Sequence, residues 1–132
     1  MARKHVKYES SRWYYWCDKL GLLVWQDFVC SRKFETNITS ASAAQWEAEL
    51  RRIMDHLHNH PSVVMWIVFN EGWGQYDTER LTNWTKNHDP SRLVNCASGW
   101  TDFPVGDIYD NHDYSFNISP AHGANFTDRA TL

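Results

Sequence analysis

Apolar and polar residues follow one another along the chain in blocks that predict alternating strands and helices. The clearest block is the continuous apolar run Val63 to Phe69, which a proline and a glycine flank and which predicts a strand buried on both faces. From about Ala43 to His58, apolar side chains recur on one face of a predicted helix, and Ser42 and Gln45 have the spacing of a capping box. A buried strand beside an amphipathic helix indicates an α/β fold with parallel strands.

Shorter blocks extend this alternation toward both ends. Gly21 is expected to end a helix in a left-handed conformation, and Val29 to Ala41 shows no periodicity and is expected to be a polar loop. The short links between blocks predict right-handed crossovers. The remaining expected elements are strands at His5 to Tyr8, Leu22 to Gln26, Leu93 to Asn95 and Ile108 to Asn111, and helices at Arg12 to Leu20 and about Asp77 to Asn87.

Length and charge narrow the class of protein. The 132 residues are about half of the ~250 that a complete eightfold barrel needs, so the chain is either a small α/β domain or a piece of a barrel. Thirteen basic and sixteen acidic residues are well mixed, which argues against a nucleic-acid partner. Mean hydropathy is −0.61 and no apolar run approaches the ~18 residues of a membrane span, so no membrane partner is expected.

Cysteine and histidine spacing gives no sign of a metal site. The three cysteines are odd in number and lack ligand spacing, which indicates neither a disulfide framework nor zinc. His56 and His60 are four residues apart, but Pro61 ends the helix there, and histidines at a helix C-terminus complement its dipole. We therefore expect no metal and no cofactor. Formal glycosylation sequons leave the compartment open, and they begin at Asn37, Asn83, Asn117 and Asn125.

Aromatic residues are the main compositional signal. The chain has eight Trp, six Tyr and six Phe. A Trp ring offers a broad apolar face that suits stacking on the C–H face of a sugar. Most of these rings are nevertheless expected to fill a core, among them Trp46 and the apolar stripe around it.

The end of the long apolar run carries the candidate chemistry. Asn70 and Glu71 follow it directly, before a loop of Gly72, Trp73 and Gly74. Barrel and doubly wound enzymes keep their reacting groups at the carboxyl ends of parallel strands. A carboxyl group that acts as a proton donor must hold its proton near neutral pH, which apolar surroundings favour. The alternative for Glu71 is a helix-capping or salt-bridged surface acid.

Two motifs resemble glycoside hydrolase family 2, the β-galactosidase, β-glucuronidase and β-mannosidase group. His60-Pro61-Ser62, followed by the strand that ends in Asn70-Glu71, resembles the family's acid/base signature. Trp16 to Asp27 is similar to an upstream signature. The resemblance implies a partial (β/α)8 TIM barrel containing about strands 2 to 6. Residues 1–132 would then be a fragment of the catalytic barrel domain that ends just before the expected nucleophile strand.

The same resemblance assigns roles to individual residues. It implies that Glu71 is the general acid/base of a retaining double displacement and that Asn70 holds the substrate 2-hydroxyl. His112 and Tyr114 match a region whose Tyr can hydrogen-bond the nucleophile, although an ordinary aromatic under a loop is the alternative. His5 resembles the family's His near the second strand, but its flanking residues depart from the commoner Ser-His-Tyr pattern.

Two further candidates rest on position. Asp27 ends a predicted strand, so it could contact a sugar hydroxyl or equally cap a turn or helix. Trp73 in its glycine loop is either a stacking platform or a loop anchor.

No Gly-Glu-aromatic-Gly-Gly motif for a nucleophile occurs in the sequence. The prediction is therefore an exo-acting β-glycosidase with a carbohydrate β-glycoside as substrate, of which this chain alone is inactive. The general pattern favours a β-galactosidase-like activity, while Trp25 to Phe28 looks like the β-mannosidase version. An inactive carbohydrate-binding or scaffold remnant is the main alternative, an inverting enzyme is the third, and a homo-oligomeric parent stays open. Unclosed sheet edges also predict self-association.

Overall fold

A parallel sheet organises the molecule. The computed structural model describes residues 1–30, 37–115 and 129–131. In this part of the chain six strands pair in sequence order, each parallel to the next. They are β1 (Ala2–Lys4), β2 (Val24–Asp27), β3 (Val63–Asn70), β4 (Leu93–Ser98), β5 (Ile108–Tyr109) and β6 (Ala130–Thr131), and the helices α1 (Ser11–Leu20), α2 (Ser40–Leu57) and α3 (Thr78–His88) connect the first four. The predicted alternation of strands and helices is confirmed.

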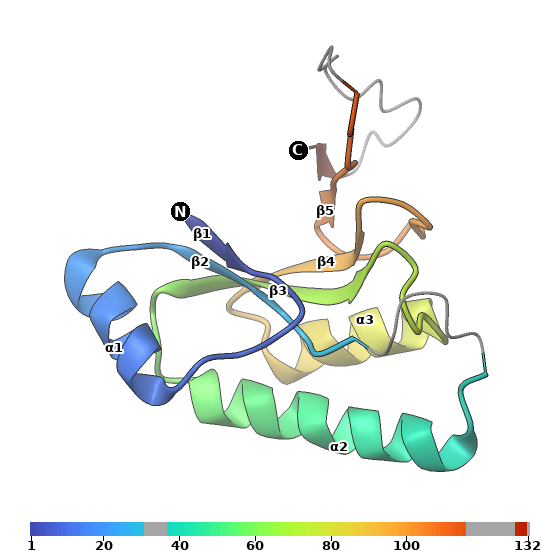
Figure 1. The fold of residues 1–132 in the computed structure, drawn as a ribbon, viewed down its shortest axis with the longest axis horizontal. Helices are drawn as coiled ribbons and strands as arrows, with labels where there is room; N and C mark the ends of the chain where they lie inside the picture. Colours follow the sequence, from blue (N-terminus) through green and yellow to red (C-terminus); the bar gives the residue numbers. More distant parts are fainter. Residues whose placement is uncertain (31–36, 116–128, 132) are drawn as a thin grey trace.

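Helices lie along one face of the sheet, and the main core fills the space between them (Figure 1). The β3 side chains of Trp66 and Val68 belong to this core together with the apolar stripe of α2. Phe28 stacks on Trp66 at a ring-centroid distance of 5.6 Å, and Trp46 stacks on Phe69 at 5.3 Å. The prediction that Trp46 is a core residue is therefore confirmed.

A second, smaller cluster lies on the other side of the strands. Met65 and Ile67 alternate along β3 with Trp66 and Val68, so they point to the opposite face. They pack with Ile108, and Trp25 covers them. β3 is thus buried on both faces, which is why its sequence reads as a continuous apolar run.

The first strand differs from its prediction. It spans Ala2–Lys4 instead of His5 to Tyr8, because Ala2 pairs with Val24 across the sheet and the next residues turn away. Val6 has a φ of 49°, and its N–H donates to the Asp27 carboxylate at 3.0 Å. That hydrogen bond holds residues 5 and 6 in a turn, so they are not available for strand pairing.

The start of α2 also differs. The helix begins at Ser40, and the side chain of Thr39 accepts from the Ser42 N–H at 3.1 Å. The predicted capping box is therefore wrong, and Gln45 instead donates to Glu49 one turn along the helix. Thr39 caps one residue before the helix because its backbone is extended there, as a cap residue requires.

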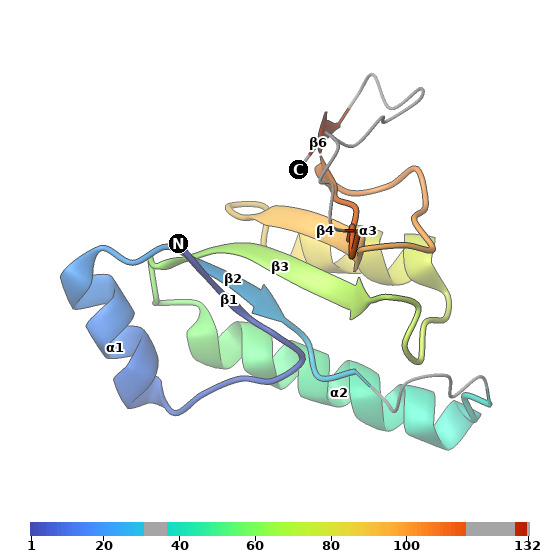
Figure 2. The same cartoon turned by 45° about the horizontal axis from the view of Figure 1, so that its top comes forward.

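The ends of other strands differ from their predictions because of how the strands pair. β4 continues to Ser98 because Ser98 lies opposite Asn70 on β3, and β5 stops at Tyr109. Gly21 ends α1 with a φ of 68°, as predicted. β6 was not predicted, and it pairs with β5 next to the upper edge of the sheet in Figure 2. None of the described helices is long and apolar enough to cross a membrane.

Candidate active site

The carboxyl ends of the parallel strands gather polar side chains at one edge of the sheet. Asp27, Asn70 and Ser98 are the last residues of β2, β3 and β4, and Asp110 comes directly after β5. All four are buried. Arg3 of β1 reaches the same place. In parallel barrel folds this is the edge where chemistry occurs.

Glu71 follows β3 in a strained backbone conformation. Its φ is 51°, in the left-handed region that costs a non-glycine residue about 1–2 kcal/mol. Its N–H donates to the Ser98 carbonyl at 2.8 Å, and its carbonyl accepts from Trp100 Nε1 at 3.1 Å. These two hydrogen bonds fix the backbone from both sides, which sets the direction of the carboxyl group.

The Glu71 carboxylate lies within the cluster. Only 6% of its side chain is exposed. Its Oε1 lies 2.8 Å from Nδ1 of His112 and accepts a hydrogen bond from the Tyr114 hydroxyl. The hydrogen bond to Glu71 raises the pKa of Tyr114, because the neighbouring carboxylate disfavours the phenolate. The structure thus brings together Glu71, His112 and Tyr114, with the Tyr114 hydroxyl donating to the Glu71 carboxylate.

Arg3 joins several site residues. Its Nε and Nη2 donate to the two oxygens of Asp27, each at 2.9 Å. Nη2 also donates to Asn70 Oδ1 at 2.8 Å, and Nη1 lies 3.1 Å from Nε2 of His112. Sequence reasoning missed Arg3 because it placed the first strand a few residues too late. Its position within the short strand β1, two residues before His5, was the available signal.

Ser98, Gly99 and Asp110 support His112 from the other side. The Ser98 hydroxyl donates to Asp110 Oδ2 at 2.8 Å, and its Oγ lies 2.9 Å from His112 Nε2. The Gly99 N–H donates to Asp110 Oδ1 at 2.9 Å. Gly99 has a φ of 97°, and a Cβ there would lie 2.6 Å from His112 Nδ1. No local sequence pattern assigns Ser98, Gly99 or Asp110 to this role.

His5, Trp73 and Asp27 meet at the same edge. The His5 and Trp73 rings pack edge to face with centroids 5.8 Å apart, and His5 Nδ1 lies 3.3 Å from Asp27 Oδ2. Asp27 is 1% exposed and holds both Arg3 and the turn at Val6. Asp27 therefore has the turn contact that the sequence left open as an alternative to sugar binding.

The histidines near the end of α2 have structural partners. Nδ1 of His60 lies 2.7 Å from the Asp18 carboxylate of α1, and Nε2 of His56 lies 2.9 Å from Ser11 Oγ. Both contacts join α1 to the region around the end of α2. Within the described residues, no three His, Cys, Asp or Glu side chains are grouped so as to hold a metal ion.

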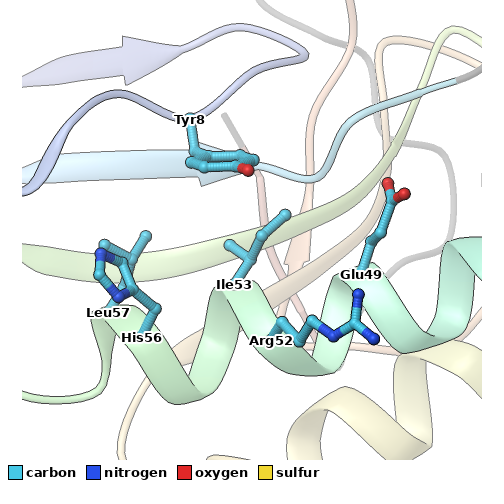
Figure 3. A pocket seen from close by; sticks show the side chains of 6 residues that line it. All are labelled: Tyr8, Glu49, Arg52, Ile53, His56 and Leu57. Atoms are coloured by element: carbon cyan, nitrogen blue, oxygen red, sulfur yellow. The ribbon is translucent and has the colours of Figure 1, made fainter.

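A pocket of about 510 Å³ lies elsewhere, between the loop before α1 and the side of α2 that faces Tyr8 (Figure 3). Tyr8 stands over the helix in this view, above Ile53. The pocket has no residue in common with the strand-end cluster. The other residues that line it are Glu49, Arg52, His56 and Leu57.

Comparison with known sequences identifies relatives. The family described as "Glycosyl hydrolases family 2, TIM barrel domain" matches residues 3–130. A β-galactosidase of Leuconostoc mesenteroides is 30% identical over 105 residues, which cover 75% of this chain and 10% of that protein. A β-mannosidase B of Thermothelomyces thermophilus is 36% identical over 108 residues, which cover 78% of this chain and 11% of that protein. The chain thus spans about a tenth of the length of these relatives.

Solved structures show the same fold. A family 2 β-galacturonidase from Eisenbergiella tayi, bound to galacturonate, matches 98% of this chain and 28% of its own with a TM-score of 0.76 and 16% identity. A β-D-mannosidase from Dictyoglomus thermophilum matches 85% of this chain and 16% of its own with a TM-score of 0.68 and 24% identity. The predicted partial (β/α)8 barrel is confirmed. From the match over residues 3–130, this chain belongs to glycoside hydrolase family 2, within the TIM barrel domain.

Proposed function

We propose that this chain supplies the acid/base side of the active site of an exo-acting, retaining β-glycosidase, with Glu71 as general acid/base. The observation that carries the proposal is the setting of the Glu71 carboxylate. It lies at the carboxyl end of β3, is 6% exposed, and receives hydrogen bonds at Oε1 in a cluster of buried polar groups. A carboxyl group in such a place can protonate the leaving oxygen and then deprotonate a water molecule in the second step.

Asn70 supports a role in holding the sugar. Its Oδ1 is engaged by Arg3 at 2.8 Å, which fixes the orientation of the amide. Its Nδ2 is buried and has no hydrogen-bond partner among the described residues. A buried unpaired donor costs about 1–3 kcal/mol, so it is best explained by a ligand that accepts from it. We assign that acceptor as the substrate 2-hydroxyl next to the reacting carbon.

The remaining substrate contacts are proposed to come from residues around Asn70 and Glu71. Trp73 and His5 present packed rings at the same edge, where a sugar face can stack. His112 and Tyr114 surround the acid, and Asp27 orients Arg3 below it. We propose Trp73, His5, His112, Tyr114 and Asp27 as substrate-site residues, with Asp27 contributing mainly through Arg3.

The nucleophile is proposed to come from residues outside this sequence. Retaining chemistry needs a second carboxylate ~5–5.5 Å from the acid. The aspartates at the strand ends have other partners: Arg3 and Val6 bond Asp27, and Ser98 and Gly99 bond Asp110. The 132-residue chain alone should therefore bind β-glycosides without cleaving them.

Substrate preference is proposed from the relatives. One is named a β-galactosidase and another a β-mannosidase, at similar identity. The sequence pattern favours β-galactoside, and the β-mannoside is the alternative to compare directly.

The proposal is tested in a protein that joins this chain to the rest of its barrel. Glu71→Gln should reduce turnover of an unactivated disaccharide by roughly 10²–10⁴-fold, and much less for an aryl glycoside whose leaving group needs no proton. Azide should restore turnover of the aryl substrate in Glu71→Ala by attacking the glycosyl intermediate. Glu79→Gln on the exposed side of α3 is the matched control and should retain activity.

Wild-type turnover of the disaccharide by Glu71→Gln would refute the acid/base role. The alternative, a binding remnant without activity, predicts that no turnover occurs even when the complete barrel is present. Saturation-transfer NMR on the 132-residue chain then separates a binding protein from a scaffold, because only the former transfers magnetisation to a β-galactoside.

A further inference from the structure

The two ring nitrogens of His112 have chemically different neighbours. Nδ1 lies 2.8 Å from Oε1 of Glu71. Nε2 lies 3.1 Å from Nη1 of Arg3 and 2.9 Å from Oγ of Ser98. A neutral imidazole carries one proton, so these neighbours decide which nitrogen donates and which accepts.

Arg3 can only donate. A guanidinium stays protonated and has no acceptor atom, so a ring nitrogen facing it must accept. Arg3 is also prevented from turning away, because Asp27 holds it at two points at 2.9 Å and Asn70 Oδ1 accepts from it at 2.8 Å. Asp27 is itself buried. A fixed donor therefore faces Nε2 of His112.

Ser98 adapts to either tautomer. Its hydroxyl has one proton and lies within reach of both Asp110 Oδ2, at 2.8 Å, and His112 Nε2. It can donate to Asp110 and accept from a protonated Nε2, or it can donate to an unprotonated Nε2. Ser98 is therefore compatible with either protonation of Nε2, and of the two neighbours of Nε2 only Arg3 discriminates between them.

The ring itself is closely packed. A Cβ at Gly99 would lie 2.6 Å from Nδ1 and 3.1 Å from Cγ of Glu71. The imidazole thus lies directly against the Gly99 backbone, on the same side as the Glu71 side chain. Trp100 packs edge to face against the ring at a centroid distance of 6.1 Å. These contacts hold Nδ1 toward Glu71.

We propose that Arg3 is a positioning residue that fixes His112 as the neutral tautomer with its proton on Nδ1, so that His112 always donates to Oε1 of Glu71. Tyr114 donates to the same oxygen. Because Oε1 then accepts two hydrogen bonds, the exchangeable proton of the acid form resides on Oε2. The assignment of that proton as catalytic rests on the proposed function of Glu71, whereas the tautomer does not.

The tautomer is measured directly by long-range ¹H–¹⁵N NMR on the 132-residue chain labelled at histidine nitrogens. His112 is assigned by its loss in His112→Gln. At neutral pH we expect a pyrrole-type shift at Nδ1 and a pyridine-type shift at Nε2. Ser98→Ala should keep this pattern, and so should Arg3→Lys, whose ammonium also only donates. Arg3→Gln should convert it to a mixture, since an amide can also accept.

A proton on Nε2 in the unchanged chain, or on both nitrogens, would overturn the proposal. So would Ser98→Ala changing the tautomer while Arg3→Gln leaves it intact. If Arg3→Gln alone fails to fold because Asp27 is left unpaired, the double variant Arg3→Gln/Asp27→Asn replaces it with the same expectation. If the kinetic test of Glu71→Gln refuted the acid/base role, the NMR result for His112 would be unaffected. The proposed function and the proposed tautomer can therefore fail separately.

Discussion

Buried polar networks occur at both ends of the sheet, and they are built differently. At the amino ends, Asp89 accepts from Arg92 at 2.5 Å and from Trp66 Nε1 at 2.9 Å. Arg92 also donates to three carbonyls, those of Val63, His58 and His60. At the carboxyl ends, the described donors to Glu71 Oε1 are an imidazole and a phenol.

The two ends of the sheet also differ in how their buried polar groups are stabilised. Burial alone would raise the pKa of Asp89, but hydrogen bonds from Ser91, Arg92 and Trp66 outweigh it, and the pKa falls to about 2. That carboxylate is therefore ionised at neutral pH and held by its donors. At the other end Glu71 has a strained backbone, and Asn70 keeps an unsatisfied amide donor within the described residues. One end of the sheet is built for stability, and the other keeps a buried donor of Asn70 that is unsatisfied among the described residues, where we propose that the substrate binds.

Removing the cation of the Asp89–Arg92 network at the amino ends should cause the largest loss of stability. Arg92→Met leaves Asp89 buried without its cation and three carbonyls without a donor, so we expect a loss of about 3–5 kcal/mol in the free energy of unfolding, measured with urea. Arg80→Met is the matched control, because Arg80 pairs with Glu47 at the surface and should cost no more than about 1 kcal/mol. Equal losses in the two variants would contradict the contrast between the networks.

The second-largest loss of stability is expected where His112 packs on Gly99. Gly99→Ala places a Cβ 2.6 Å from Nδ1 at a φ of 97°, which combines overpacking with backbone strain. We expect a loss of about 2–4 kcal/mol and displacement of the imidazole from Glu71. Gly21→Ala, at a φ of 68° with nothing within 4 Å, should cost only the strain, about 1–2 kcal/mol. Urea unfolding of both variants measures the difference, and the packing argument fails if the two losses are equal.

The sequence predicted the buried strand β3 more completely than it predicted the candidate active site. Val63 to Phe69 was recognisable because a strand buried on both faces needs apolar residues at every position. Glu71 and Asn70 were found because they interrupt that run. Arg3 and Ser98 were missed, because their roles come from pairing between strands far apart in sequence and no local pattern records it.

Acid should weaken the amino-end network selectively. Asp89 has a folded-state pKa of about 2, below its ordinary 3.8, so its stabilisation is complete above about pH 4 and is lost as the pH falls through about 2. The difference corresponds to roughly 2 kcal/mol. Urea unfolding followed from about pH 5 to about pH 2 should show this decline, and Asp89→Asn should lack that part of it. An unchanged acid slope in Asp89→Asn would show that other groups are responsible.

The smallest change in stability is expected from the isosteric substitution Glu71→Gln at the carboxyl ends of the strands. Glu71→Gln keeps an oxygen that accepts from His112 and Tyr114, so the described hydrogen bonds at Oε1 survive. We expect a change below about 1 kcal/mol in the free energy of unfolding at neutral pH, compared with about 2 kcal/mol or more for Asp89→Asn. A loss in Glu71→Gln as large as in Asp89→Asn would mean that the Glu71 charge stabilises the fold. A stability that hardly depends on this charge is what a carboxyl group needs if it is to gain and lose a proton in each catalytic cycle.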